Sequence, residues 1–141
     1  MKKVFSFLFL LPAFVGMMFA CTAKVTDAKE LQGKWNIVEV NGEKVAVDEP
    51  PFFEFDIQAG KLHGNAGCNI VNSSVVLDDK DASAVSFTQA MSTMMACPNM
   101  DLESSVLKSM EMVRSVKGGK DANEMNLLDE AGNVLFVLVR K

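Results

Sequence analysis

The chain has 141 residues, and its 14 Lys and Arg residues against 18 Asp and Glu residues give a formal net charge of −4 at pH 7. An acidic chain lacks the clustered positive charge that binds nucleic acid or a bare anionic membrane surface, which argues against both as partners. The length suits one compact domain with a real hydrophobic core.

The first twenty residues predict a secretory signal peptide. Lys2 and Lys3 form a short positive region, and residues 4–19 are almost wholly apolar, which is the layout of an export signal. This run falls short of the roughly 20 apolar residues that a transmembrane helix needs, so a retained span is the less favoured interpretation. Removing residues 1–20 takes away two basic residues and leaves 12 against 18 acidic residues, or −6.

Cys21 indicates what kind of signal this is. Residues 18–21 resemble a bacterial lipobox, in which the cysteine thiol receives a diacylglycerol before cleavage. Ala20 and Cys21 fit that pattern, whereas Met18 and Phe19 replace its usual leucine and small residue. We expect Cys21 to be lipidated and residues 21–30 to tether a domain at residues 31–141 to the outer or inner membrane, because two acyl chains anchor a domain stably. The alternative is ordinary cleavage after Ala20, which leaves a free N-terminal thiol.

The domain is predicted to open with a β-hairpin. Residues 35–40 are rich in β-forming residues, with Trp35 and Ile37 expected on one face and Val38 and Val40 on the other. Asn41-Gly42 is a strong hairpin signal because both residues tolerate positive φ. Residues 43–47 should return as a second strand.

Further strands follow. Phe53, Phe55 and Ile57 alternate with acidic residues, which predicts a half-buried strand over residues 52–57. A short strand is expected at residues 61–63, a bulge or tight crossing at residues 64–67, a strand at residues 68–71 that continues over 75–77, and a strand over residues 84–95.

One helix is predicted after Pro98, with Asn99 or Asp101 as its cap. Its apolar positions form a single stripe, which a helix lying on a sheet needs. Residues 117–120 should end this region, and residues 124–128 and 134–139 should be the last strands, with the continuously apolar residues 134–139 in a central position. The order indicates an α+β domain, a curved and mostly antiparallel sheet (a roll or partial barrel) packed around one helix. The helical stripe comprises Leu102, Val106, Leu107, Met110 and Val113.

Cys68 and Cys97 are predicted to form a disulfide. If Cys21 carries lipid, these two cysteines remain, and an exported chain meets an oxidising compartment. The alternatives are a reactive thiol or a metal-binding pair, but the Cys-x-x-Cys spacing of thiol-redox sites is absent.

No catalytic constellation is recognisable, and no enzyme activity, metal or cofactor is expected. His63 is the single histidine, and a general base needs a matched nucleophile. No Gly-x-Ser-x-Gly or His-Glu-x-x-His motif is present. The hydroxyl candidates are Ser73, Ser74, Ser92 and Thr93.

Three further interpretations are less favoured than purely structural roles for the same residues: a Cu(I) site, a calcium site and a cleft for an apolar ligand. Soft sulfur ligands suit Cu(I), although methionine is also an adaptable core filler. The acidic run lacks the pattern of a calcium loop and reads as a solvated turn. Phenylalanines and methionines could line a cleft for lipid, or simply fill the core. The residues concerned are Met91, Met94, Met95 and Met100 for copper; Glu54, Asp56, Asp78, Asp79 and Asp81 for calcium; and Phe52, Phe53, Phe55 and Phe87 for the cleft.

The motifs together resemble those of the META domain, or HslJ-like, family of small bacterial envelope proteins. The resemblance runs from about Leu31 to Val139. It implies a small β-rich roll with one helix, no established enzyme activity, and a link to envelope stress and drug tolerance. The chain departs from the family before its last hairpin, where an aromatic is usual and this chain offers Val113 and Val116. The motifs are Leu31-x-Gly33-x-Trp35, Gly67-Cys68-Asn69, Thr93-Met94-Met95-Ala96-Cys97, Glu103, Leu127-Leu128-Asp129 and a turn at Gly132.

The sequence therefore predicts a monomeric, membrane-anchored envelope lipoprotein whose domain lies in the periplasm or at the cell surface. The domain is expected to be a non-enzymatic binding or scaffold module, with an envelope protein as a candidate partner. The alternative is a carrier of a lipid or small hydrophobic ligand in a cleft between sheet and helix.

Overall fold

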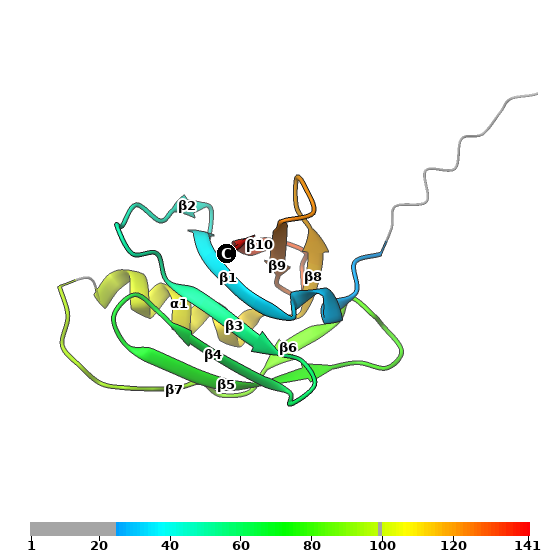
Figure 1. Cartoon of the computed structure of the whole chain (residues 1–141), viewed down its shortest axis with the longest axis horizontal. Helices are drawn as coiled ribbons and strands as arrows, with labels where there is room; N and C mark the ends of the chain where they lie inside the picture. Colours follow the sequence, from blue (N-terminus) through cyan, green and yellow to red (C-terminus); the bar gives the residue numbers. More distant parts are fainter. Residues whose placement is uncertain (1–24, 99) are drawn as a thin grey trace, which may run out of the picture.

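The computed structural model describes residues 25–98 and 100–141, so the expected signal peptide and Cys21 lie outside the described residues. These residues form a mostly antiparallel, barrel-like sheet with one α-helix (Figure 1). No described helix has both the length and the hydropathy needed to cross a membrane. The elements are η1 (Ala28–Leu31), β1 (Gly33–Val40), β2 (Glu43–Lys44), β3 (Phe52–Asp56), β4 (Lys61–Asn65), β5 (Ile70–Leu77), β6 (Val85–Phe87), β7 (Met91–Ser92), α1 (Met100–Met112), β8 (Ser115–Gly118), β9 (Glu124–Leu128) and β10 (Val134–Arg140).

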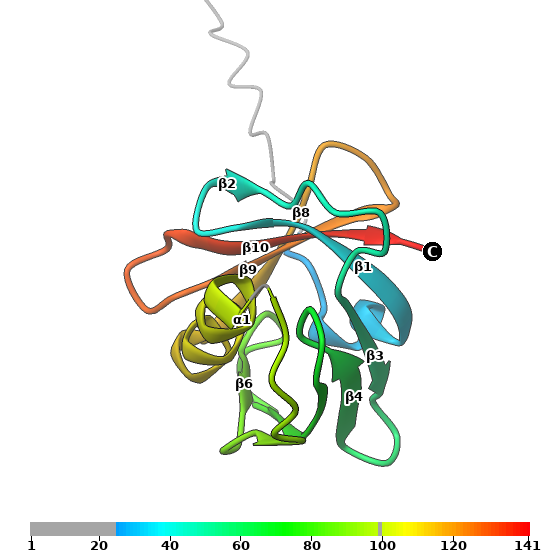
Figure 2. The same ribbon diagram turned by 90° about the vertical axis from the view of Figure 1, so that its left-hand side faces the viewer.

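The strands lie in the order β6-β5-β4-β3-β1-β10-β9-β8, with β2 paired to β1 and β7 paired to β5. The two ends of this order meet at a bridge between Ala84 and Ser115. There the Val85 N–H donates to Arg114 O at 3.1 Å, and the Val116 N–H donates to Ser83 O at 2.9 Å. The sheet is therefore nearly closed into a barrel, and α1 runs along one side of it (Figure 2).

Aromatic residues fill the centre of the barrel. Trp35, Phe53, Phe55 and Phe136 are all essentially inaccessible to solvent. Phe53 meets Phe136 edge to face, with 5.3 Å between ring centroids, a favoured geometry for aromatic pairs. The α1 residues Val106, Met110 and the following Val113 belong to the same core, so the helical stripe expected from the sequence is confirmed.

Several local predictions are confirmed. Asn41 and Gly42 both have positive φ, at 51° and 82°, as the hairpin signal predicts. Phe53 and Phe55 are buried, whereas Glu54 between them is exposed. Strand β10 lies between β1 and β9, in the central position expected of its apolar sequence.

The prediction that Val40 lies on the opposite face of β1 from Trp35 and Ile37 is wrong. The pairing of β1 with β10 shifts register between Ile37 and Glu39. A bulge inserts one extra residue and turns the following side chains to the opposite face. Val40 therefore joins Trp35 and Ile37 in the core instead of pointing away from them.

The long strand predicted over residues 84–95 is two short strands, β6 and β7, separated by residues 88–90. The ladder breaks at Thr88, whose Oγ1 accepts the Ser74 N–H at 3.1 Å while its carbonyl accepts the Ser73 hydroxyl at 2.7 Å. The return strand at residues 43–47 is likewise shorter, ending at Lys44. Conversely β5 runs unbroken from Ile70 to Leu77, and β8 was not predicted.

A bulge or tight crossing was predicted over residues 64–67, but Gly64 and Asn65 are the last two residues of the regular strand β4. Gly64 pairs with Phe53, and a Cβ at this position would collide with the backbone oxygen of Phe52. Glycine is required there by close backbone approach, whereas Gly67 has a φ of +134°, a conformation that side chains disfavour.

The chain enters the domain before residue 31. Ala28 is buried, its N–H donates to Ala82 O at 2.7 Å, and the Gly118 N–H donates to Thr26 Oγ1 at 2.7 Å. Part of the segment expected to be a tether thus packs beside the closure of the barrel.

Candidate functional site

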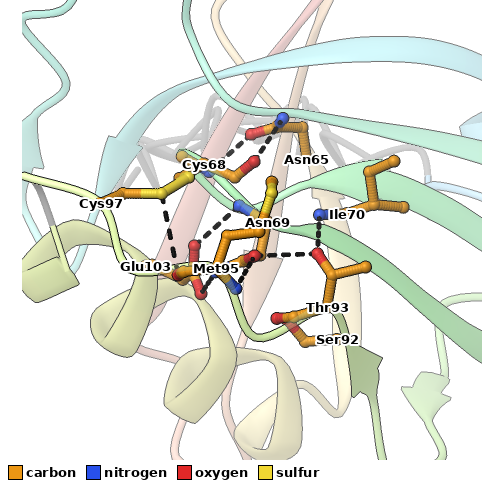
Figure 3. The surroundings of a disulfide bond; sticks show 10 residues. Asn65, Cys68, Asn69, Ile70, Ser92, Thr93, Met95, Cys97 and Glu103 are labelled. Carbon is orange, nitrogen blue, oxygen red and sulfur yellow. Dashed lines mark hydrogen bonds between the residues drawn. A yellow bond between two sulfur atoms is a disulfide. The ribbon is translucent and has the colours of Figure 1, made fainter.

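The site is built on the turn at residues 66–69, between β4 and β5. The Ala66 N–H donates to Asn69 O at 3.0 Å, and the Gly67 N–H donates to Asn65 Oδ1 at 2.8 Å. Asn65 Nδ2 in turn donates to Cys68 O at 3.3 Å. Side-chain bonds of this kind fix a turn that the backbone alone would leave open, so the side chain of Asn69 has a defined direction (Figure 3).

The side-chain amide of Asn69 binds the backbone of the segment after β7. Asn69 Nδ2 donates to Met95 O at 3.1 Å, and the Met95 N–H donates to Asn69 Oδ1 at 2.8 Å. The Thr93 hydroxyl donates to the same Oδ1 at 2.8 Å. The amide thus offers one acceptor and one donor, as the backbone of a neighbouring strand would.

Glu103, in the first turn of α1, completes this arrangement. Its Oε2 accepts the Asn69 N–H at 2.9 Å, and its Oε1 accepts Asn69 Nδ2 at 2.7 Å. Glu103 and Asn69 are both buried, and buried carboxylates need such partners. A negative side chain is also favoured in the first turn by the helix dipole. The structure therefore explains Glu103 as the link that ties α1 to the turn; we call Asn69 and Glu103 the amide–carboxylate clamp.

A disulfide joins Cys68 to Cys97 beside the clamp, with 6.3 Å between the two Cα atoms. The two cysteines are partly exposed. Together the disulfide and the clamp fix residues 93–97 on both sides, even though this segment has no regular secondary structure between β7 and α1.

The backbone of this segment alternates between paired and outward-facing groups. The Thr93 N–H donates to Ile70 O at 3.1 Å, and Met95 is paired with Asn69 as described. In an antiparallel ladder the residues between such pairs direct their N–H and C=O groups away from the partner strand. Ser92 lies opposite Val71 in the β5–β7 ladder, between the Met91–Asn72 pair and the Thr93–Ile70 bond, so its N–H and C=O are directed away from β5. Met94 follows the same alternation, and Ser92 and Met94 therefore present an open strand edge.

An apolar groove of about 520 Å³ lies between this segment and α1. From α1 it is lined at positions spaced three and four apart, which lie on one helix face. The lining residues are Asn69, residues 92–96, Met100, Glu103, Ser104 and Leu107. We call this hollow the methionine groove.

Methionines give the groove an exposed apolar surface. Met94 is 97% exposed, Met95 56% and Met100 41%, and Met91 in the adjoining β7 is 73% exposed. Clustered exposed apolar side chains mark interaction sites more often than scattered ones do. Of the four residues that the sequence suggested as copper ligands, Met94, Met95 and Met100 thus line this groove, and Met91 lies in the adjoining strand.

The other candidate residues lie elsewhere. His63 is exposed on β4, and its Nδ1 lies 2.9 Å from Asn72 Oδ1 on β5. The Ser73 hydroxyl, on β5, donates to the Thr88 carbonyl. Thr88 lies on the opposite side of β5 from β4, the strand that carries His63. The His63 ring instead lies beside Phe52, with 6.4 Å between centroids. The structure does not bring His63 and a hydroxyl together through any recorded contact.

The predicted cleft residues are mostly core residues. Phe53, Phe55 and Phe87 are buried and contact one another. Phe52 lies on the outer surface, where Lys34 Nζ sits 3.7 Å from the centre of its ring. The apolar groove that does exist is lined by methionines rather than phenylalanines.

Two of the acidic residues considered for calcium, Asp78 and Asp81, act in turns. Asp78 Oδ1 accepts the Lys80 N–H at 2.7 Å. Asp81 Oδ1 accepts the Ser83 hydroxyl at 2.7 Å and the Ser83 N–H at 2.9 Å, and these bonds lower the pKa of Asp81. Among the described residues, no cluster of three or more His, Cys, Asp or Glu side chains could hold a metal ion.

The sequence motifs include Asn69 and Glu103 but do not show that these residues bond to each other. The open edge at Ser92 and Met94 and the groove-lining role of Ser104 and Leu107 were not predicted from the sequence. One signal was available, because Glu103 stands three and seven residues before the buried Val106 and Met110. A carboxylate on the apolar face of a helix needs a buried polar partner.

The chain belongs to the META domain family, whose model matches residues 28–141. The family name covers the HslJ-like proteins and confirms the resemblance seen in the motifs; it is not a family known for enzymatic activity. No match was found among curated proteins.

Two solved structures share the fold. A protein from Burkholderia xenovorans, determined by NMR, has a TM-score of 0.60 at 22% identity, covering 80% of this chain and 85% of its own. A DUF4847 family protein from Bacteroides vulgatus has a TM-score of 0.59 at 15% identity, covering 79% and 94% respectively. At these identities the likeness concerns the fold, a mostly β, barrel-like sheet with one helix.

Proposed function

We propose that this protein is a lipid-anchored binding module of the cell envelope that holds an extended, apolar segment of a partner protein in the methionine groove. The observation that carries the proposal is the open strand edge at Ser92 and Met94 beside an apolar groove. An extended peptide that pairs with such an edge gains main-chain hydrogen bonds, and its alternate side chains enter the adjoining pocket.

The lining of the groove suits an apolar and variable partner. Methionine side chains are unbranched and polarisable, so they adapt to different apolar shapes. Flexible methionine-rich surfaces are used by proteins that accept more than one partner. We therefore expect selectivity for apolar character and extended conformation rather than for one residue sequence.

The edge is held ready for binding. Met95 is fixed through Asn69, and Asn69 through the buried Glu103. Fixing a binding segment in advance lowers the entropy lost on association. This gives the clamp a role in the proposed function that does not require it to touch the partner.

Anchoring at Cys21 would direct the groove away from the membrane. The described chain begins at one end of the molecule, and the segment after β7 runs to the opposite end (Figure 1). A short tether to the bilayer would leave the groove accessible to envelope proteins. The proposed contribution to envelope stress tolerance rests on the family resemblance alone.

Site-directed photo-cross-linking in intact cells tests this function. A photoreactive residue at position 94 of the full chain should give discrete adducts with one or more envelope proteins, identified by mass spectrometry. The same residue at position 112, an exposed site on α1 that does not line the groove, should not give these adducts.

Two substitutions of Ser92 make the test specific. Ser92→Pro removes the outward N–H, and proline is tolerated on a strand edge whose N–H faces away from its neighbour. Adducts at position 94 should disappear with Ser92→Pro and persist with Ser92→Ala. Adducts that survive Ser92→Pro would refute strand pairing.

The alternative function, a carrier of a lipid or small hydrophobic ligand, is favoured by the apolar lining of the same groove. Native mass spectrometry of the full chain after mild extraction separates the two functions. A stoichiometric co-purifying lipid that is lost when Met95 and Met100 are changed to Ser would support the carrier, whereas a clean protein mass together with protein adducts would support peptide binding.

A further inference from the structure

The seven described methionines fall into two groups by exposure. Met110 and Met125 are 1% and 4% exposed. The other five exceed 40%, and four of them, Met91, Met94, Met95 and Met100, lie in or beside the methionine groove. The fifth, Met112, lies at the end of α1. We call the first four the methionine face.

We propose that the methionine face is a modification site at which two-electron oxidants, such as hypochlorous acid or hydrogen peroxide, convert thioethers to sulfoxides. With hydrogen peroxide, a sulfur lone pair attacks one oxygen, an S–O bond forms, the O–O bond breaks, and the second oxygen leaves as water after proton transfer. With hypochlorous acid, the lone pair attacks chlorine, the O–Cl bond breaks with release of hydroxide, and water then displaces chloride from the chlorosulfonium ion, releasing protons. In both cases the sulfur loses two electrons to the oxidant. The product is a methionine sulfoxide, which reductases of the methionine sulfoxide class can reverse.

The cysteine and tryptophan side chains of the described chain, which also react readily with these oxidants, are protected. Cys68 and Cys97 share a disulfide, so neither offers a thiolate to an oxidant. Trp35 is wholly buried. Susceptibility of sulfur to oxidation follows its exposure, and Met94 is 97% exposed. The exposed thioethers are therefore the most accessible reduced sulfur in this part of the chain.

The fold does not depend on these side chains. The segment that carries Met94 and Met95 is held through its backbone by Asn69 and by the Thr93 N–H bond to Ile70. The disulfide fixes its end at Cys97. Oxidation usually damages proteins by placing a polar sulfoxide in a core, but here the sulfoxides would face solvent and the core methionines would be spared.

A consequence follows that rests on the proposed function. A sulfoxide is polar and makes a methionine-rich surface less apolar. Oxidation would therefore weaken binding of an apolar segment in the groove, and reduction would restore it. The methionine face would thus make the proposed binding responsive to oxidants that reach the envelope.

Peptide mapping tests the modification without any assumption about a partner. The purified full chain is treated with a small molar excess of hypochlorous acid, and peptides are followed by mass spectrometry over time. We expect a gain of about 16 Da at each residue of the methionine face, about tenfold faster than at Met110 and Met125, because exposure governs the rate. The far-ultraviolet circular dichroism and the melting temperature should stay unchanged while this occurs.

Other results would overturn the proposal. Equal rates at buried and exposed methionines, or loss of structure before the face is oxidised, would show that the face is not a distinct site. A variant with all four residues changed to Leu should lose most of the early oxidant consumption, whereas Met112→Leu should lose only its own share. Cross-linking from position 94 before and after oxidation then tests the consequence: sulfoxides with undiminished adducts would refute only the control of binding, and absent adducts throughout would refute only the proposed function.

Discussion

The carboxylate of Glu103 accepts both the backbone N–H and the side-chain amide of Asn69, at 2.9 Å and 2.7 Å. The two residues are 34 positions apart in the chain and both are buried. One bond fixes where the turn sits, and the other fixes how the amide is oriented. Because the same amide binds Met95, this contact between helix and turn fixes the groove wall together with the disulfide and the Thr93 bond to Ile70.

Removing the carboxylate should be costly for the fold. Glu103→Ala leaves the buried backbone N–H of Asn69 and one hydrogen of its Nδ2 unpaired, and we expect a loss of about 3 kcal/mol in the free energy of unfolding. Glu103→Gln retains one acceptor oxygen, so its free energy of unfolding should fall by less than that of Glu103→Ala. Urea denaturation measures both, and Glu111→Ala, an exposed change on the same helix, should stay within about 0.5 kcal/mol of the wild type. Equal losses in Glu103→Ala and Glu111→Ala would contradict the role of the clamp.

The disulfide between Cys68 and Cys97 should be detectable chemically and should stabilise the fold. Thiol counting on the denatured, unreduced full chain should find neither thiol free. The bridge spans a sequence separation of 29 residues, and closing a loop of this length is worth roughly 3–4 kcal/mol in the chain-entropy model. Cys68→Ser with Cys97→Ser should lower stability by up to this amount while the clamp keeps the domain folded. Two reactive thiols in the untreated protein would refute the pairing.

The β9–β10 turn should respond to acid. Asn133 donates to Asp129 through its side chain and its backbone, and these bonds lower the pKa of Asp129 below its ordinary value. A lowered folded-state pKa means stability that is present above the ordinary carboxyl pKa and lost as the pH falls through the folded-state pKa.

Carboxyl NMR titration checks this expectation. The midpoint of Asp129 should lie below the ordinary value and rise in Asn133→Ala, and the wild type and the variant should converge in stability at strongly acid pH. A midpoint that Asn133→Ala leaves unmoved would show that these bonds do not hold the carboxylate.

Lipidation at Cys21 remains a prediction from the sequence. Cys21→Ser should prevent acyl transfer, so that the chain is either left unprocessed or released from the membrane fraction, because two acyl chains provide the stable anchor. Membrane fractionation and intact-mass measurement follow both outcomes. A variant that is processed normally and still fractionates with the membrane would rule out this anchor.

Local patterns in the sequence predicted much of the architecture. The Asn41-Gly42 turn, the alternation in β3 and the apolar stripe of α1 each depend on residues a few positions apart, so they can be read without knowing the fold. The family motifs extended this to a β-rich barrel with one helix. Predictions failed where backbone geometry changed locally, as at the β1 bulge that turns Val40 inward and at Thr88, which interrupts the strand expected through residues 84–95.

The sequence by itself determined most of the elements, the core-facing residues of most strands and the candidate cysteines, since these follow from short-range periodicity and residue chemistry. The tertiary structure alone decided that Asn69 pairs with Met95 and Glu103, that Ser92 and Met94 form an open edge, and that three methionines line one groove. These relationships join residues 26 and 34 positions apart. They arise only when the barrel and α1 bring distant segments into hydrogen-bonding distance, which no local pattern encodes.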